Sequence, residues 1–250
     1  MKKLMAANWK MYKTRAEAIK TAEELVRLVG KLPEDREVLV FPPFTSIDAV
    51  SQVFSSRAGF LVGGQDFYTE KEGAYTGEVA PGMLLDCGAQ YGLTGHSERR
   101  HVLGETDVTV GAKTAFGLSS GLDVVLCVGE LIEERKAGKV EDVISRQIRA
   151  GFKDVAFDID PSRLAVAYEP VWAIGTGEVA GPDEIIDAHA ICRKVLLELF
   201  EENGSDIRVL YGGSVKPQNC SGIISLDNVD GVLVGGASLQ GESFSKIVLA

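Results

Sequence analysis

The sequence predicts an α/β protein built as one closed (β/α)8 barrel. Eight short apolar runs recur along the chain, each followed by a polar or glycine-rich turn and a segment with helical periodicity. Some runs are apolar throughout, as in Val124 to Val128, which indicates strands buried on both faces of a parallel sheet. Eight such units in 250 residues suit a closed barrel, in which functional residues follow the carboxyl ends of the strands.

The expected strands are dominated by apolar and β-branched residues. In chain order they are Leu4 to Asn8, Val38 to Phe41, Leu61 to Gly64, Tyr91 to Thr94, Val124 to Val128, Leu164 to Tyr168, Ile207 to Tyr211 and Gly231 to Val234. Parallel strands need crossover connections, so we expect helices to cover the outside of the sheet.

The first and sixth expected helices have the clearest boundaries. Thr14 can cap the first helix with Glu17 three residues on, and Gly30 ends it. Its apolar face is Ala18, Ala22, Leu25, Val26 and Val29. The sixth helix begins near Pro182 and is expected to end at Asn203 and Gly204. Its apolar face is Ile185, Ala188, Cys192, Val195 and Leu199.

Residues 1–250 are expected to form a single catalytic domain, because no linker, repeat or low-complexity tract divides them. An open doubly wound sheet is the alternative architecture. It is disfavoured because no G-x-G-x-x-G fingerprint follows the first strand and no change of pattern marks a second half.

The net charge of −10 and the pI of about 4.9 disfavour nucleic acid and anionic membrane surfaces as partners. An anionic substrate would need local lysines and backbone N–H groups. The cysteines Cys87, Cys127, Cys192 and Cys220 lie far apart, so neither a disulfide framework nor a metal site is expected. No apolar segment is long enough for a membrane span, and we expect a reducing cytoplasm as the compartment.

Glu169 follows the sixth strand and precedes a proline, which favours an extended backbone that presents the carboxylate at the barrel end. A carboxylate there suits general base catalysis. The alternative is a solvated loop glutamate. The next residues have a stiff proline at one end, glycines at the other and apolar residues between, which is typical of a hinged lid that excludes water. This predicted lid is Pro170, Val171, Trp172, Ala173, Ile174, Gly175, Thr176 and Gly177. A loop packed permanently on the barrel or on a neighbouring subunit is the alternative.

His96 follows the fourth strand and opens a helical turn, where the backbone dipole favours a neutral ring that can polarise a carbonyl. His101 and His189 are interpreted as structural. Glu98 either orients its neighbours or only complements the helix dipole. Lys10 ends the first strand and would stabilise a phosphate or an oxyanion, unless it is a surface lysine.

Glycines follow the last two strands and expose backbone N–H groups that suit a phosphate. They are Gly212, Gly213, Gly235 and Gly236, with Ser214 beside the first pair. Glycines after strands are often only turns, but two such clusters in adjacent units favour phosphate binding.

Five segments together resemble the triosephosphate isomerase family in order and spacing across nearly the whole chain. They are Asn8-Trp9-Lys10-Met11, Gly95-His96-Ser97-Glu98-Arg99-Arg100, Cys127-Val128-Gly129-Glu130, Tyr168-Glu169-Pro170-Val171-Trp172-Ala173-Ile174-Gly175-Thr176-Gly177 and Tyr211-Gly212-Gly213-Ser214-Val215. The resemblance implies a TIM barrel that interconverts dihydroxyacetone phosphate and D-glyceraldehyde 3-phosphate through an enediolate. The pathways implied are glycolysis, gluconeogenesis and pentose phosphate metabolism.

The resemblance also implies the residue roles. Glu169 would move the proton, His96 would serve the enediolate oxygens, and Lys10 and Asn8 would complete the electrostatic site. The pairing of a glutamate base with a neutral histidine comes from the family and not from this sequence alone. The phosphate would be bound by Gly175, Ser214, Gly235 and Gly236, with Glu98 and Cys127 as supporting residues. No metal or organic cofactor is implied.

A homodimer is implied as well, with the loop from Gln65 to Glu78 reaching into the partner subunit. The loop itself agrees, because Phe67, Tyr68 and Tyr75 are more aromatic surface than a free loop carries. Tyr12 and Asp66 stand where the family often has asparagine. These departures affect the interface rather than the catalytic set.

Two other functions fit parts of the pattern. An aldolase-type lyase would use Lys10 as a Schiff-base nucleophile, but it leaves His96 and the lid without a purpose. A noncatalytic phosphate-binding barrel would not need Glu169, His96 and Lys10 at one end.

Overall fold

The computed structural model describes residues 1–174 and 180–250 and confirms the closed barrel predicted from the sequence. The strands follow one another around the ring in chain order, and β1 pairs in parallel with both β2 and β8. They are β1 Lys3–Asn8, β2 Arg36–Phe41, β3 Phe60–Gly64, β4 Tyr91–Thr94, β5 Asp123–Val128, β6 Leu164–Tyr168, β7 Arg208–Tyr211 and β8 Gly231–Val234. Every expected strand is present to within two residues at each end.

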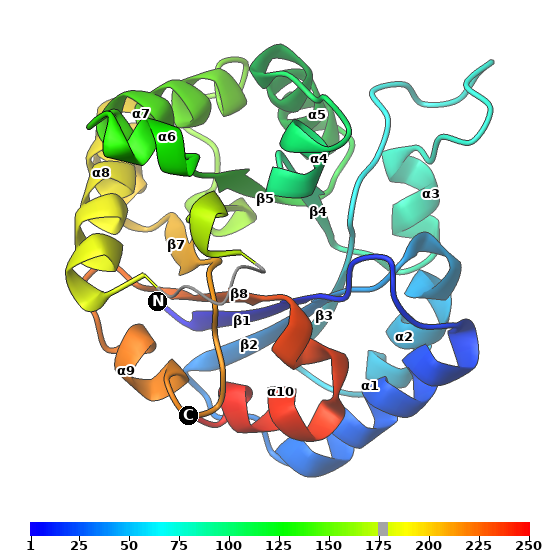
Figure 1. Cartoon of the computed structure of the whole chain (residues 1–250). Helices are drawn as coiled ribbons and strands as arrows, with labels where there is room; N and C mark the ends of the chain where they lie inside the picture. Colours follow the sequence, from blue (N-terminus) through cyan, green and yellow to red (C-terminus); the bar gives the residue numbers. More distant parts are fainter. Residues whose placement is uncertain (175–179) are drawn as a thin grey trace.

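Helices surround the strands on the outside (Figure 1). The α-helices are α1 Arg15–Val29, α2 Ile47–Phe54, α3 Pro81–Asp86, α4 Ser97–His101, α5 Asp107–Ser119, α6 Ile132–Lys136, α7 Val140–Gly151, α8 Pro182–Phe200, α9 Cys220–Ile224 and α10 Gly241–Val248. Short 3-10 turns lie between them: η1 Phe44–Ser46, η2 Pro161–Arg163, η3 Val171–Ala173, η4 Glu201–Ser205 and η5 Gly236–Leu239.

The core has two layers because successive side chains of a strand point to opposite faces. In β1, Met5 and Ala7 pack outward in a large cluster shared with the helices. Leu4 and Ala6 point the other way, into a smaller cluster built from strand residues alone, which fills the inside of the barrel. The barrel is therefore a packed core and not a channel.

Strand register brings the carboxyl ends of the strands to one rim. Tyr168 at the end of β6 pairs with Val128 of β5 and with Tyr211 of β7. Asn8 at the end of β1 pairs with Phe41 at the end of β2. The polar residues that follow these strands consequently meet at the same rim, as the predicted barrel requires.

One long segment leaves this compact arrangement. Residues 65–80, between β3 and α3, extend away from the barrel without regular secondary structure (cyan in Figure 1). The segment contains the loop from Gln65 to Glu78 that the sequence singled out. Within it, Tyr68 and Tyr75 pack ring to ring with centroids 4.6 Å apart.

Candidate active site

A cavity of about 290 Å³ opens at the carboxyl-end rim of the barrel. Loops that follow β1, β4, β6, β7 and β8 line it. The lining residues are Asn8, Lys10, His96, Glu169, Ala173, Ile174, Gly212, Gly213, Ser214, Val215, Lys216, Leu233, Gly235, Gly236 and Ala237. The structure thus brings together the strand-end residues singled out from the sequence.

Glu169 is not the solvated glutamate that the alternative required, because only 2% of it is exposed. One carboxylate oxygen, Oε1, lies 3.0 Å from Nε2 of His96. The other, Oε2, accepts a 2.9 Å hydrogen bond from the backbone N–H of Ser97. The carboxylate and the imidazole come from different units of the barrel and share one small site.

Glu169 is placed by close backbone packing at the ends of β5, β6 and β7. Its N–H donates to the carbonyl of Val128 at 2.7 Å. A β-carbon at Gly129 would lie only 1.7 Å from the carbonyl oxygen of Glu169, so no other residue fits there without moving the strand end. This contact gives a physical reason for glycine in the Cys127-Val128-Gly129-Glu130 segment.

The surroundings of Glu169 hold it as an anion. Burial raises its pKa, but the charge and hydrogen bond of His96, the Ser97 N–H and the charge of Lys10 lower it, and the net pKa shift is downward. The carboxylate is therefore ionised, as a base must be, throughout the neutral pH range.

His96 caps the short helix α4, and Gly95 before it makes this placement possible. Gly95 adopts φ +68°, a left-handed conformation that glycine reaches without a steric penalty. Nδ1 of His96 accepts a 3.3 Å hydrogen bond from the N–H of Glu98, so the proton of a neutral ring lies on Nε2 and faces the Glu169 carboxylate.

The pKa of His96 reflects opposing effects. Burial lowers it, whereas the carboxylates of Glu169 and Glu98 raise it, and the net pKa shift is upward. The helix position predicted a neutral ring. The contact with the Glu169 carboxylate favours the protonated ring instead, whereas the hydrogen bond from the Glu98 N–H to Nδ1 favours the neutral one. A substrate oxygen that took the place of the carboxylate beside Nε2 would remove the main contact that raises the pKa.

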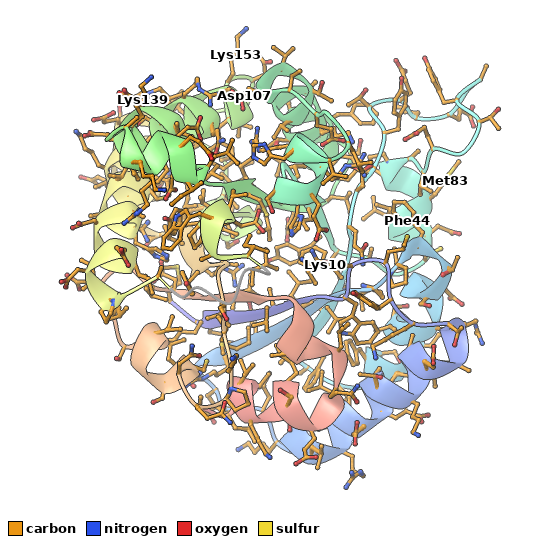
Figure 2. The ribbon with its side chains drawn as sticks, viewed as in Figure 1. Lys10, Phe44, Met83, Asp107, Lys139 and Lys153 are labelled. Atoms are coloured by element: carbon orange, nitrogen blue, oxygen red, sulfur yellow. The ribbon has the colours of Figure 1, made fainter. Side chains whose placement is uncertain are left out.

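Lys10 is held in the site rather than free on the surface, and Figure 2 shows its side chain within the ring of helices. Its Nζ lies 2.7 Å from Oε1 of Glu98, so the two side chains form an ion pair beside the cavity. Its backbone has φ +52°, and its N–H donates to Oδ1 of Asn8 at 2.9 Å. Gln65 donates to the carbonyls of Lys10 and Phe41 at 2.8 and 2.9 Å.

The loops after β7 and β8 form another part of the cavity wall, next to Lys10 and Glu169. Ser214, Gly235 and Gly236 line it, together with the glycines after β7. The β7 loop is fixed by Asn219, which accepts from the N–H of Lys216 at 2.7 Å and donates to the carbonyl of Ser214 at 3.1 Å. A buried carboxylate and a glycine-rich wall thus line the same small cavity.

Comparison with known proteins shows the family of the chain. The sequence model of the family described as triosephosphate isomerase matches residues 3–250. The chain is 61% identical over 251 residues to the triosephosphate isomerase of Nitratidesulfovibrio vulgaris (strain DSM 19637 / Miyazaki F), with 100% of both chains covered. It is 62% identical over 250 residues to that of Oleidesulfovibrio alaskensis, again with 100% of both covered. The chain belongs to the triosephosphate isomerase family.

A more distant relative extends this result. The triosephosphate isomerase of Lawsonia intracellularis is 46% identical to the chain over 250 residues, covering 100% of this chain and 98% of the relative. As a member of the triosephosphate isomerase family, the chain is an isomerase, and the family, barrel and enzyme class predicted from the sequence are confirmed.

Residues 170–174, the first part of the predicted lid, are held beside the cavity. Pro170 leads into η3, and Nε1 of Trp172 donates to Oε1 of Glu130 at 2.9 Å. Tyr168 donates to the same oxygen at 3.1 Å. Val171 and Trp172 are half-buried, while Ala173 and Ile174 line the cavity. Gly175, Thr176 and Gly177 lie outside the described residues.

Cys127, expected as a supporting residue, does not line the cavity. It is fully buried in the cluster inside the barrel. Burial raises the pKa of its thiol well above the usual value, so the sulfur is a neutral packing group beneath Glu169.

Two contributors to the site were missed from the sequence. Lys216 lines the cavity two residues after Ser214, and its position after a glycine-rich strand end was the available signal. Gln65, which follows β3, donates a hydrogen bond to the backbone carbonyl of Lys10, which follows β1. No local sequence pattern predicts this contact.

No helix in residues 1–174 and 180–250 is long and apolar enough to cross a membrane. Over the same ranges, no group of three or more His, Cys, Asp or Glu side chains is arranged to hold a metal ion.

Proposed function

We propose that Glu169 and His96 carry the proton transfers of the isomerisation. The chain interconverts dihydroxyacetone phosphate and D-glyceraldehyde 3-phosphate, a reaction of glycolysis and gluconeogenesis. The observation that carries the residue assignment is the 3.0 Å contact between the Glu169 carboxylate and Nε2 of His96 in one cavity. Both groups can therefore reach a single three-carbon substrate.

In the proposed mechanism, Glu169 is the base. Both of its carboxylate oxygens are engaged, one with His96 and one with the Ser97 N–H, so one of them must turn toward the substrate carbon. The oxygen takes a proton from one carbon and returns it to the adjacent carbon. Because the carboxylate is nearly fully buried, the proton is shielded from bulk water between the two steps.

His96 acts on the substrate oxygens. The hydrogen bond that the Glu98 N–H gives to Nδ1 places the ring proton on Nε2, which faces the cavity side of Glu169. From there a neutral imidazole can donate to the carbonyl as negative charge develops on it. The Nε2 proton would pass to the former carbonyl oxygen, and Nε2 would then take up the proton of the hydroxyl on the adjacent carbon, so that the carbonyl and the hydroxyl exchange places while the imidazole regains its proton.

Lys10 and Asn8 complete the electrostatic site. The Lys10 ammonium lines the cavity and lies 2.7 Å from Glu98, which holds the lysine side chain in place. An oriented cation in a partly buried site stabilises an oxyanion more than a solvated one does. The ion pair also argues against the lyase alternative, since a Schiff base needs a neutral amine.

We assign the phosphate group to the glycine-rich side of the cavity. Ser214, Gly235 and Gly236 line this side. Lys216 also lines the cavity, and its positive charge would attract the phosphate although the chain as a whole carries a net charge of −10. We also assign Gly175 to the phosphate site, on the basis of its position in the sequence. The lid, residues 170–177, would close over the phosphate and keep water from the enediolate.

The test is Glu169→Gln, which keeps the shape of the side chain and removes the base. Turnover of glyceraldehyde 3-phosphate in a coupled assay should fall by about 10²- to 10⁴-fold. The matched control is Glu133→Gln, because Glu133 is an exposed glutamate of α6 and its variant should keep full activity. Turnover of Glu169→Gln within tenfold of the unmodified enzyme would refute the assignment.

We also propose a homodimer joined through the loop from Gln65 to Glu78, with residues 1–250 acting as one catalytic domain. The loop projects from the barrel, and exposed apolar side chains surround its base, among them Met83 and Phe44 on the same side in Figure 2. Such a patch marks an interaction surface.

The free thiols of all four cysteines support a reducing cytoplasm as the compartment.

A further inference from the structure

Two loops meet at one side of the cavity and are joined to each other by side-chain bonds. The β1–α1 loop, residues 9–14, supplies Lys10 to the cavity. The β8–α10 loop, residues 235–240, supplies Gly235, Gly236 and Ala237. The relative position of these loops therefore decides how far the Lys10 cation lies from the glycine-rich wall.

Lys13 makes the main connection between the loops. Its Nζ donates to the carbonyl oxygen of Leu239 at 2.7 Å and to Oγ1 of Thr21 at 2.9 Å. The same ammonium lies over the ring of Trp9, 5.2 Å from its centroid. A charge-assisted bond to a carbonyl is stronger than a neutral one, so this contact ties the end of η5 to the β1–α1 loop.

Trp9 makes a second connection one residue earlier in η5. Its Nε1 donates to the carbonyl of Ser238 at 3.1 Å, and both residues are almost fully buried. Oγ of Ser238 in turn donates to the carbonyl of Gly235 at 2.7 Å. The chain of bonds thus runs from the β1–α1 loop to a glycine of the cavity wall.

These bonds satisfy groups that η5 cannot satisfy itself. The last carbonyls of any helix have no partner within the helix, and a lysine side chain is one of the groups that can bond them. In η5 the carbonyls of Ser238 and Leu239 receive donors from Trp9 and Lys13. Without them, the short turn would have to find water for both carbonyls and would lose its fixed position.

The backbone conformation of Lys13 indicates that its side-chain contacts stabilise the loop. Lys13 adopts φ +77°, in the left-handed region that disfavours residues with a β-carbon and suits glycine. A lysine there is strained, and its side chain contacts offset that strain. Burial lowers the pKa of Lys13, in agreement with an ammonium drawn away from solvent, although the charges of Glu17 and Glu24 raise it.

We propose that Lys13 is a positioning residue that fixes the β8–α10 loop for the substrate phosphate. It acts through Leu239 and touches no part of the cavity itself. The proposal rests on the function proposed above, in which Gly235 and Gly236 bind the phosphate. Losing the Nζ would loosen the phosphate wall while leaving Glu169 and His96 in place.

The test compares Lys13→Met with Lys20→Met. Methionine keeps most of the length of the Lys13 side chain but removes the ammonium, and with it the bonds to Leu239 and Thr21 and the contact over the Trp9 ring. Lys20 is the matched control, because it is an exposed lysine on the same side of the molecule and its loss changes the net charge equally. The measurements are KM and kcat for glyceraldehyde 3-phosphate, the inhibition constant of inorganic phosphate, and the elution volume on a sizing column.

In Lys13→Met, we expect KM and the phosphate inhibition constant to rise together by about tenfold, as for loss of one charge-assisted hydrogen bond. We expect kcat to fall less than about threefold, since the base and the imidazole are untouched. Lys20→Met should match the unmodified enzyme. A merely structural lysine would lower stability and leave both constants within about twofold, and that result overturns the proposal, as does an equal rise in Lys20→Met.

Lys13→Gly provides an independent check. Glycine relieves the left-handed strain, so this variant should fold at least as well as Lys13→Met while still losing the Nζ. The same rise in both constants is expected, and unchanged constants would refute the positioning role. Failure of the Glu169 assignment is distinguishable, because the phosphate inhibition constant does not depend on the identity of the base.

Discussion

Single residues in this molecule take their charge states from burial and from a few close groups. Glu169 and His96 show both effects, since each is buried and each lies against the other. His189, the residue interpreted as structural, shows burial acting with little opposition. It is fully buried, and its Nδ1 lies 2.9 Å from the carbonyl of Asn228. Burial lowers the pKa of His189 to about 4, so the folded protein holds it neutral.

This histidine should make the protein sensitive to mild acid. The unfolded chain takes up a proton on His189 near pH 6.5, while the folded protein does so only near pH 4. The stability from this site is complete above pH 6.5 and is lost as the pH falls toward 4. Between pH 7 and pH 5, His189 should cost about 2 kcal/mol of the free energy of unfolding.

The measurement is urea unfolding at pH 7 and pH 5, with protein concentration fixed, for the unmodified protein and His189→Gln. The variant should lose about 2 kcal/mol less between the two pH values, whatever its stability at pH 7. Equal losses for both proteins would show that His189 does not titrate as described. His101→Gln is the control, because His101 is exposed.

Secondary-structure elements follow local signals closely where those signals are strong. Helix α1 begins after Thr14 and ends at Gly30, as predicted. The capping box is complete, since Oγ1 of Thr14 accepts from the Glu17 N–H while the Glu17 carboxylate accepts from the Thr14 N–H at 2.8 Å. Strong caps at both ends explain why the sequence located this helix correctly.

Thr14→Ala should therefore lower the free energy of unfolding by about 1 kcal/mol. The loss arises because the N–H groups at the start of α1 lose their side-chain acceptor. Thr14→Ser keeps the hydroxyl and serves as the control. Chemical denaturation measures both variants. A cost for alanine no greater than that for serine would contradict the capping role.

The end of α8 was predicted less well. The sequence placed it at Asn203 and Gly204, whereas the α-helix ends at Phe200 and the chain continues as the 3-10 turn η4 to Ser205. The glycine is needed for a different reason. A β-carbon at Gly204 would lie 2.4 Å from the carbonyl oxygen of Leu196, because the turn folds back against the helix. Composition marked the region, and tertiary packing set the boundary.

At the scale of the whole molecule, the loop from Gln65 to Glu78 projects from the barrel. Tyr75 in this loop is 41% exposed although it packs on Tyr68. At the base of the loop, Asp66 is buried between Lys113 at 2.6 Å and Arg99 at 2.9 Å. Two cations thus contact the buried carboxylate at the base of the loop.

The proposed homodimer predicts a particle of about twice the 26.8 kDa of the chain in sedimentation at micromolar concentration. Tyr75→Lys should weaken association, because it places a charge within the apolar anchor of the interface. Phe157→Lys is the matched control, since Phe157 is an exposed aromatic in the connection before β6, near the opposite end of the barrel. A chain that sediments as a monomer, or equal effects of both variants, would exclude this interface.

The eight strands, their order and the residues at their ends could be predicted from the sequence, because short apolar runs, helical periodicity and glycine-rich turns each depend on a few neighbouring positions. Glu169, His96 and Lys10 were recognised in this way. The partners of these groups were not. Gln65 reaches Lys10, and Lys13 reaches Leu239, only because distant units meet around the ring.

The sequence by itself determined the barrel and the family, and it singled out the side chains to which we assign the reaction, since each depends on residue type and local spacing. Only the tertiary structure decided which atoms of Glu169 and His96 meet, how burial and neighbouring charges set their pKa values, and which loops form the glycine-rich wall of the cavity. Those properties depend on distances between segments far apart in the chain, and closure of the sheet fixes those distances.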